Sequence, residues 1–201
     1  MNFGAIKKND VANGPGIRVN LFVSGCTHHC KNCFNKDTWN FDYGEEFTNK
    51  HLGEILDALA PDYVSGFTFL GGEPMEDINR GEVLKIAQAI KEKYPQKDIW
   101  IYTGYLVEEL LVLADMWDSN RIPDSYAVPR NRVISGATPA KDASDLCKLL
   151  NLVDVIVDGE FVEEKKNLRL KFRGSENQRI IHMPSTIAHG EIIKAAITDR
   201  L

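Results

Sequence analysis

The sequence predicts an α/β protein of one domain, a partial (β/α) barrel of about six strands with a mostly parallel sheet. Apolar runs typical of buried strands alternate with segments whose apolar residues recur at helical spacing, as in βαβ units. The 201 residues suit one domain but fall short of the ~250 typical of a full eight-stranded barrel. Polar or glycine-rich residues follow several strands, which is typical of a ligand-binding edge.

A turn, a strand and a helix open the pattern. The turn-forming run 13–16 precedes a strand at 18–24. Thr48 begins a helix whose apolar residues share one stripe, and Pro61 ends it. We expect Arg18, at the start of the strand, to be solvated.

Two further strand–helix pairs follow by the same criteria. Apolar runs predict buried strands at 66–70 and 98–102, and helical spacing predicts helices around 83–90 and 106–117. Pro95 lies beyond the end of the first of these helices. Strands that alternate with helices in this way are expected to run parallel.

The second half of the chain is less regular. Residues 118–145 are rich in Pro, Ser, Asn and Asp and are interpreted as an irregular insertion, with a short strand or hairpin at 126–135. The remaining predicted elements are a brief helix at 142–150, strands at 153–159 and 180–183, and a C-terminal helical extension at 185–201.

Composition limits the classes of function. The net charge of −5 argues against nucleic acid as the main partner. No apolar run approaches the roughly 18 residues of a membrane span, and the first ten residues lack the apolar stretch of a signal peptide. We therefore expect a cytoplasmic protein that binds neither nucleic acid nor membrane.

Three of the four cysteines, Cys26, Cys30 and Cys33, lie within eight residues at the spacing C-x3-C-x2-C. One loop can bring three such sulfurs around a single metal centre, and thiolates suit zinc or iron–sulfur clusters. Three ligands leave one iron of a [4Fe–4S] cluster open to a substrate. A structural zinc site would instead take His28 or His29 as its fourth ligand, and the spacing leaves both alternatives open.

Other residues near these motifs have simpler interpretations. His28 and His29 are expected to be solvated, because histidines in loops usually are. Trp39 is expected to pack, and Cys147 lies on a helical apolar stripe as a small buried hydrophobe. Crowding of three cysteines in one loop favours metal binding in a reducing compartment over disulfides.

Glycine and polar residues at three strand ends form the second group of candidates. Glycine lets the backbone approach a ligand closely, so we expect contact from Gly72 before Glu73. Parallel strands bring their carboxyl ends to one edge, where these residues would meet the cysteine loop. The candidates are Gly71, Gly72, Glu73, Thr103, Gly104 and Asp158.

The cysteine loop after the first strand resembles that of radical S-adenosylmethionine enzymes, and Gly71-Gly72-Glu73 resembles their GGE motif. The resemblance implies that the three sulfurs hold one [4Fe–4S] cluster per chain and that S-adenosylmethionine binds its fourth iron. It also implies that the GGE backbone contacts the amino group of S-adenosylmethionine. Many members have an aromatic residue just before the last cysteine. Here Asn32 stands there and Phe34 follows, so Asn32, Cys33 and Phe34 are the expected cofactor contacts of the loop.

Four further segments narrow the resemblance to glycyl-radical-enzyme activases, and three of them resemble those that act on anaerobic ribonucleoside-triphosphate reductase. The resemblance extends from about residue 8 to residue 183. The segments are Asn13-Gly14-Pro15-Gly16-Ile17-Arg18, followed by 98–105, 157–161 and 172–179.

The resemblance implies reductive cleavage of S-adenosylmethionine to a 5′-deoxyadenosyl radical, which generates a glycyl radical on the reductase. A one-electron donor such as flavodoxin would supply the electron, and no catalytic acid or base is needed in this chain. The alternatives are an activase of another glycyl radical enzyme and a non-enzymatic zinc-binding adaptor. A deazaguanine-forming synthase shares the GGEP signature but usually has a longer gap between its first two cysteines.

Overall fold

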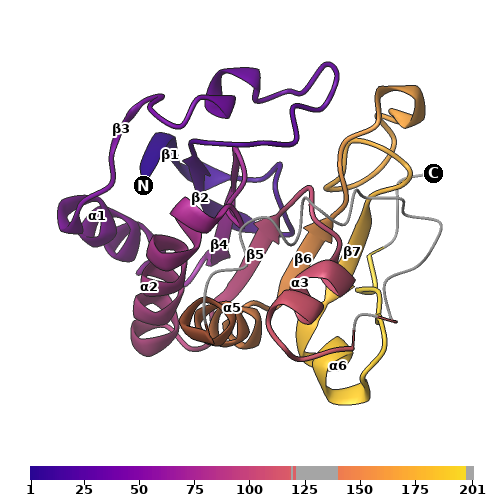
Figure 1. Ribbon diagram of the computed structural model, residues 1–201. Helices are drawn as coiled ribbons and strands as arrows, with labels where there is room; N and C mark the ends of the chain where they lie inside the picture. Colours follow the sequence, from indigo (N-terminus) through magenta and orange to yellow (C-terminus); the bar gives the residue numbers. More distant parts are fainter. Residues whose placement is uncertain (119, 121–139, 198–201) are drawn as a thin grey trace.

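The computed structural model describes residues 1–118, 120 and 140–197 (Figure 1). In this part of the chain, one open sheet of seven strands forms the centre, in the order β3-β1-β2-β4-β5-β6-β7. The strands are β1 (Asn2–Asp10), β2 (Ile17–Val23), β3 (Glu45–Glu46), β4 (Val64–Gly71), β5 (Asp98–Tyr102), β6 (Val155–Asp158) and β7 (Arg179–His182). The predicted α/β class is confirmed, with seven strands in place of about six.

The sheet is parallel at its centre and antiparallel at both edges. The strands β2, β4, β5 and β6 pair parallel to one another. β1 pairs antiparallel with both β2 and β3, and β7 pairs antiparallel with β6. The carboxyl ends of the four parallel strands therefore meet at one edge, as the sequence predicted.

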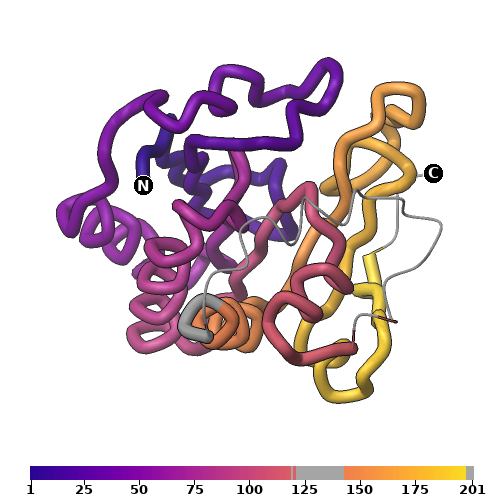
Figure 2. Tube along the Cα trace, viewed as in Figure 1, coloured from indigo at the N-terminus to yellow at the C-terminus, as the bar shows by residue number. Residues whose placement is uncertain are grey.

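Helices cover one face of the sheet (Figures 1 and 2), and α2 and α5 lie side by side there. In the described ranges, no helix is long and apolar enough to cross a membrane. The helices are α1 (Asn49–Leu59), α2 (Asp77–Lys93), α3 (Val107–Leu113), α5 (Ala140–Leu152) and α6 (Met183–His189), with 3-10 turns at Lys36–Trp39 and Glu163–Lys165.

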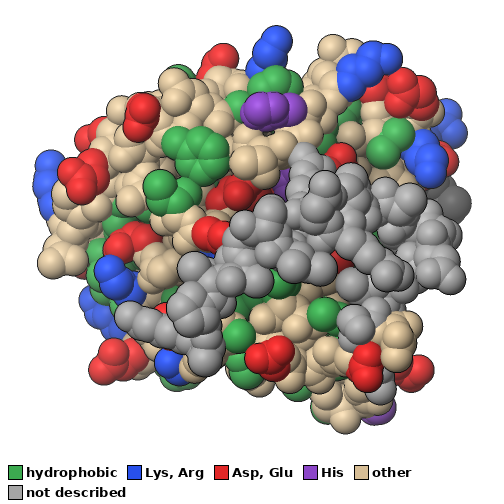
Figure 3. All heavy atoms as spheres, in the orientation of Figure 1, with side chains coloured by type: hydrophobic (Ala, Val, Ile, Leu, Met, Phe, Trp, Pro, Cys, Tyr) green, Lys and Arg blue, Asp and Glu red, His purple; other side chains and the backbone are tan. Residues whose placement is uncertain are grey.

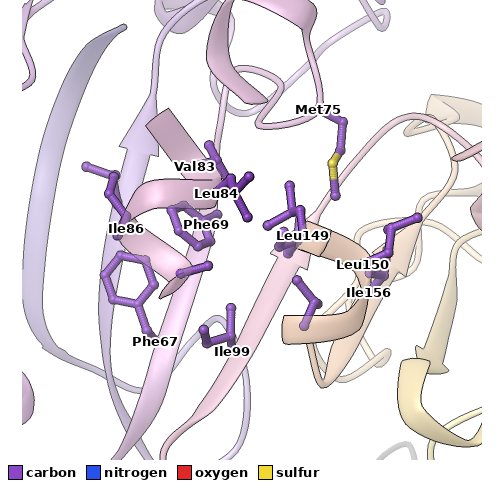
Figure 4. Packing of buried hydrophobic residues seen from close by; sticks show 14 of the residues in the cluster. Phe67, Phe69, Met75, Val83, Leu84, Ile86, Ile99, Leu149, Leu150 and Ile156 are labelled. Atoms are coloured by element: carbon purple, nitrogen blue, oxygen red, sulfur yellow. The ribbon is translucent and has the colours of Figure 1, made fainter. Parts of the chain in front are cut away.

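The main core lies between the sheet and these helices, and strand alternation decides which side chains enter it. Ile99 of β5 is fully buried there beside Phe67 and Phe69 of β4, while Trp100 faces the opposite side with Val157. Figure 4 shows the strand side chains meeting Val83, Leu84 and Ile86 of α2 and Leu149 and Leu150 of α5. Full burial of one such side chain contributes about 1.5–3 kcal/mol.

Arg18 is fully buried on the face of the sheet opposite the helices, so the prediction that it is solvated was wrong. Its guanidinium donates to Thr68 Oγ1 and to the Phe67 carbonyl, both at 2.8 Å, and lies 2.6 Å from an oxygen of Asp98. Neighbouring strands supply these acceptors, and paired acceptors are what permit a buried charge.

Three parts of the fold differ from the sequence prediction, and one is the two-residue strand β3, which no sequence pattern indicated. Strand β1 was not predicted, because its second half is polar and it lies near the edge of the sheet. The C-terminal helix expected at 185–201 is shorter: α6 ends at His189, where Gly190 has a φ of +68°. The chain then returns to the sheet, and Lys194 forms an antiparallel bridge with Ile181.

The remaining elements lie close to their predicted positions. Thr48 is the N-cap of α1, as its sequence pattern indicated. Helix α5 begins at Ala140, two residues before the predicted helix. The strand or hairpin expected at 126–135 lies outside the described residues, as does most of the expected insertion.

Candidate metal centre and ligand cleft

A cleft of about 650 Å³ lies at the carboxyl ends of the parallel strands, a volume within the range of small-molecule sites. The loop after β2 forms one side and the loop after β6 the other, and both extend beyond the strand ends in Figure 1. Cys26, Cys30 and Cys33 all line this cleft. All four cysteines of the chain are free thiols.

The cysteine loop curls tightly because two of its residues adopt the left-handed backbone conformation. His29 has a φ of 52° and Asn32 a φ of 56°, a region that few residues other than glycine occupy. One precedes Cys30 and the other precedes Cys33. Such conformations persist where the surrounding structure requires them, and here they accompany three sulfurs that face one cleft.

Burial governs the chemistry of the first two thiols. It raises the pKa of Cys26 to about 12, with Glu73 adding to the effect, and raises the pKa of Cys30 to about 11, with Glu160 adding. A metal that binds thiolates displaces such protons, because its positive charge compensates the anions that burial disfavours.

Backbone N–H groups surround the sulfurs. The Asn35 N–H donates to Cys33 Sγ at 3.4 Å, and the Phe161 N–H, from the far side of the cleft, acts on Cys30. The sulfur of Cys26 accepts hydrogen bonds from the backbone N–H groups of residues 28 and 29. Hydrogen bonds to sulfur are among the features that set the potential of an iron–sulfur cluster, so the three thiols and their surroundings fit a [4Fe–4S] group.

The side chain of His28 is 4% exposed and bridges the two sides of the cleft, so the expectation that it is solvated was wrong. Its Nδ1 lies 2.9 Å from Glu160 Oε1, and its Nε2 lies 3.0 Å from Glu73 Oε2. Its ring packs edge-on against the ring of Tyr105, with 4.6 Å between the ring centres. Burial disfavours the imidazolium, but the two carboxylates outweigh it and raise the pKa of His28 to about 9.

His29 is exposed, as predicted, and its ring lies 4.7 Å from the ring of Trp39, which packs against it. The two histidines thus have different surroundings, since His28 contacts two carboxylates and His29 an aromatic ring. Across the described ranges, no three His, Cys, Asp or Glu side chains are grouped so as to hold a single metal ion.

Glu73 is 1% exposed and links the loops that follow β4 and β5. Its Oε1 accepts a hydrogen bond from the Met75 N–H at 2.9 Å, and its Oε2 accepts one from the Gly104 N–H at 2.7 Å. The carboxylate of Glu73 is therefore engaged with the protein itself.

Gly72 lies where the loop after β4 touches the cysteine loop. Its N–H donates to the Val23 carbonyl at 2.7 Å, and an added Cβ would come within 2.5 Å of the Gly25 carbonyl oxygen. Glu76 supports the same junction by accepting hydrogen bonds from the Thr27 N–H at 2.8 Å and its hydroxyl at 2.6 Å. A side chain at position 72 would push the cysteine loop away.

The structure brings most of the sequence-predicted site residues together. The cleft-lining members of the set are Cys26, Cys30, Cys33, Phe34, Gly71, Gly72, Glu73, Thr103 and Gly104. Asn32 is exposed and Asp158 is fully buried, and neither lines the cleft. Contact of any of these residues with a cofactor stays a prediction.

Asp158 belongs instead to a buried ionic cluster behind the cleft. Arg179 donates to Asp158 at 2.9 Å and to both oxygens of Glu108 at 2.8 and 2.6 Å, and Val107 N–H donates to Asp158 at 3.0 Å. Sequence reasoning missed this cluster and the His28–Glu160 pair. Their members lie 71 and 132 positions apart in the chain, so no local pattern could indicate them.

An open α/β sheet with a three-cysteine loop after its first parallel strand defines the class of a cluster-binding domain with a ligand cleft. Comparison with known proteins agrees: residues 12–181 match the family described as 4Fe-4S single cluster domain. Most of the described sheet and all of the cleft-lining cysteines fall within this match.

The chain is also similar to several proteins named anaerobic ribonucleoside-triphosphate reductase-activating protein. The relative from Enterobacteria phage T4 is 35% identical over 90% of this chain and 93% of its own length. Those from Vibrio cholerae serotype O1 and Escherichia coli K12 are 35% and 33% identical and are covered over 97% and 99% of their lengths. The chain belongs to the 4Fe-4S single cluster domain family and, within it, to the reductase-activating proteins.

Proposed function

We propose that this chain activates anaerobic ribonucleoside-triphosphate reductase by generating a glycyl radical on it. One observation carries the proposal: three cysteines of one loop face a cleft that is also lined by the glycine-rich ends of β4 and β5. The names of the relatives support the identity of the partner. When bound, a [4Fe–4S] cluster and S-adenosylmethionine would supply reductive cleavage to a 5′-deoxyadenosyl radical.

The residues of the chain would bind the cluster, orient S-adenosylmethionine and enclose the reaction. Cys26, Cys30 and Cys33 would hold the cluster through three of its irons, which leaves one iron open toward the cleft. Backbone N–H groups at the sulfurs would tune it. No side chain need act as a general acid or base, since the protein's tasks are positioning and exclusion of side reactions.

Backbone groups rather than side chains would contact S-adenosylmethionine. Gly71 and Gly72 line the cleft beside the cysteine loop, and their lack of a side chain lets the peptide carbonyls approach a ligand. Thr103 and Gly104 line the same cleft one strand further along. Glu73 and His28 would act indirectly, by holding these loops at fixed separations.

The remaining parts of the proposal concern the setting of the reaction. The sheet would form a partial barrel around the cleft. The target glycine would come from the reductase and would reach the cleft from the face of the sheet that the helices leave uncovered. A one-electron donor such as flavodoxin would reduce the cluster. The cytoplasm would supply the reducing conditions that four free thiols need.

Anaerobic reconstitution with iron and sulfide, followed by reduction and addition of S-adenosylmethionine, tests the proposal. The expected result is about four irons per chain, formation of 5′-deoxyadenosine, and a glycyl radical in added reductase detected by electron paramagnetic resonance. Single alanine variants of Cys26, Cys30 and Cys33 should each lose 5′-deoxyadenosine formation. A colourless zinc protein that leaves S-adenosylmethionine intact would overturn the proposal.

The choice of reductase partner needs its own comparison. Activation of anaerobic ribonucleoside-triphosphate reductase, measured as glycyl radical per chain, is set against activation of another glycyl radical enzyme under the same conditions. If S-adenosylmethionine is cleaved but the radical forms only on the other enzyme, the proposed reaction stands and the proposed partner is wrong.

A further inference from the structure

The loop after β6 forms an ordered protrusion beside the mouth of the cleft. Residues 163–178 fold back on themselves: Lys166 and Ser175 form an antiparallel bridge, and the Glu176 N–H donates to the Lys165 carbonyl at 2.9 Å. Asn167 closes the tip, since its Oδ1 accepts the Arg169 N–H at 3.0 Å and its carbonyl accepts the Leu170 N–H at 3.3 Å. These hydrogen bonds fix the residues that the tip presents.

The tip presents an apolar side chain to solvent. Leu168 is 85% exposed, and it lines both the cleft and an adjoining groove of about 660 Å³. Phe34, which is 67% exposed, lines the cleft, and Val11, which is 68% exposed, lines the groove. Half of the six large apolar side chains that are exposed in the described ranges thus line the cleft or the groove that adjoins it, and such a concentration marks an interaction surface.

The same protrusion carries positive charge on an acidic protein. Residues 163–178 include five basic and three acidic residues, a net charge of +2, whereas the whole chain has −5. Lys166 Nζ lies 5.2 Å from the centre of the exposed Phe34 ring, so charge and apolar surface adjoin. Figure 3 shows Lys and Arg side chains at the upper right, over the loop that follows β6 in Figure 1.

We propose that this rim, formed by Leu168, Arg169, Lys166, Phe34 and Val11, docks an acidic segment of the reductase that carries an apolar anchor residue. The inference rests on the proposed function and names the surface by which the partner is held while its glycine reaches the cleft. Positive side chains around an apolar centre fit an acidic partner, because charge complementarity steers the encounter and a buried apolar anchor slows dissociation.

Two substitutions on the rim and two matched controls test the docking surface. Leu168→Asp removes the apolar side chain of the rim that the anchor residue of the reductase would contact. Tyr63→Asp places the same charge at another exposed side chain (61%), just before β4 and at the end of the parallel strands opposite the cleft. Arg169→Glu reverses charge on the rim, and Lys50→Glu does so on α1. All four proteins carry the reconstituted cluster.

Binding to the reductase, glycyl radical yield and reductase-independent formation of 5′-deoxyadenosine are measured for each protein. Both rim variants should raise the Kd for the reductase roughly tenfold or more. They should also lower the yield of glycyl radical when the activating chain is at limiting concentration. Arg169→Glu should leave 5′-deoxyadenosine formation without reductase unchanged, because Arg169 lines the groove and not the cleft. Binding by the wild-type protein should weaken as salt rises, and Arg169→Glu should reduce that dependence.

Rim variants that bind the reductase as tightly as Tyr63→Asp and Lys50→Glu would overturn the inference. So would a rim that holds a second copy of this chain, seen as a dimer that Leu168→Asp disrupts while reductase binding is unchanged. Loss of 5′-deoxyadenosine formation in the wild-type protein would instead defeat the proposed function, and the binding comparison would still decide the docking surface.

Discussion

The carboxylate of Glu73 accepts a hydrogen bond from the backbone N–H of Gly104 at 2.7 Å, although 31 positions separate the two residues. The bond joins the loops at the ends of neighbouring parallel strands. His28, from a third loop, lies 3.0 Å from the same carboxylate oxygen. One buried side chain therefore sets the spacing of three loops that line the cleft, and the first predictions concern this junction.

Glu73→Ala should lower the free energy of unfolding by about 3 kcal/mol. The substitution leaves the buried N–H group of Met75 and the partly buried N–H group of Gly104 without an acceptor, and the loss of an acceptor for a buried donor costs about 1–3 kcal/mol. Urea unfolding of the reconstituted protein measures the effect. Glu82→Ala on α2, which removes only an exposed pair with Lys85, should change stability by less than about 1 kcal/mol. Equal losses in the two variants would contradict the junction.

Gly104→Ala should impair S-adenosylmethionine cleavage. An added Cβ would lie 2.6 Å from a ring carbon of His28, so the ring must shift and release the cysteine loop from Glu73. The measurement is the rate of 5′-deoxyadenosine formation together with the KM for S-adenosylmethionine.

Gly53→Ala serves as the control for this substitution. Nothing lies within 4 Å of a Cβ at Gly53 in α1, and alanine there should stabilise the helix by about 0.5–1 kcal/mol without altering the rate. A Gly104→Ala protein with wild-type rate and KM would show that the packing of His28 on position 104 does not matter for the cleft.

Arg179→Met should lower the free energy of unfolding by about 3–5 kcal/mol at neutral pH, because Asp158 and Glu108 then stay buried without a cation. Thermal unfolding measures the loss. Lys148→Met, which breaks an exposed pair with Asp145, should cost less than about 1 kcal/mol.

The stability that Arg179→Met loses relative to the wild-type protein should be smaller at acidic pH than at neutral pH. Burial already raises the pKa of Asp158 with Arg179 in place, and loss of the cation raises it further. A carboxyl whose folded pKa is raised contributes stability below its unfolded pKa of about 4 and loses it as pH rises through the folded pKa. Unfolding curves from about pH 4 to pH 7 should therefore show a growing deficit, whereas a constant one would indicate lost packing alone.

Cys147→Ala should retain the full iron content and wild-type formation of 5′-deoxyadenosine. Cys147 is a partly buried side chain of α5 that packs against the main core, away from the cleft. Its loss should cost about 1 kcal/mol of stability. Iron analysis beside Cys33→Ala separates the two roles, and a drop in iron for Cys147→Ala would place a fourth thiol at the cluster.

Local sequence patterns predicted much of the fold because the spacing of apolar residues along a segment shows which of its sides is buried, whichever partner it packs against. The apolar runs at 98–102 and 66–70 became β5 and β4, and the stripe after Thr48 became α1. Strand β1 escaped prediction, since its polar second half carries no local strand signal and the strand is held by pairing with β2. The final helix was overextended because Gly190 ends it.

Short segments of the sequence predicted the residues of the site, because the spacing of Cys26, Cys30 and Cys33 and the glycines at the strand ends can be recognised locally. The surroundings of these residues depend on the tertiary fold. The burial of Arg18 and His28 depends on acceptors from distant strands and loops. A single sequence shows that a side chain can carry charge, but not which partner compensates that charge when the chain folds.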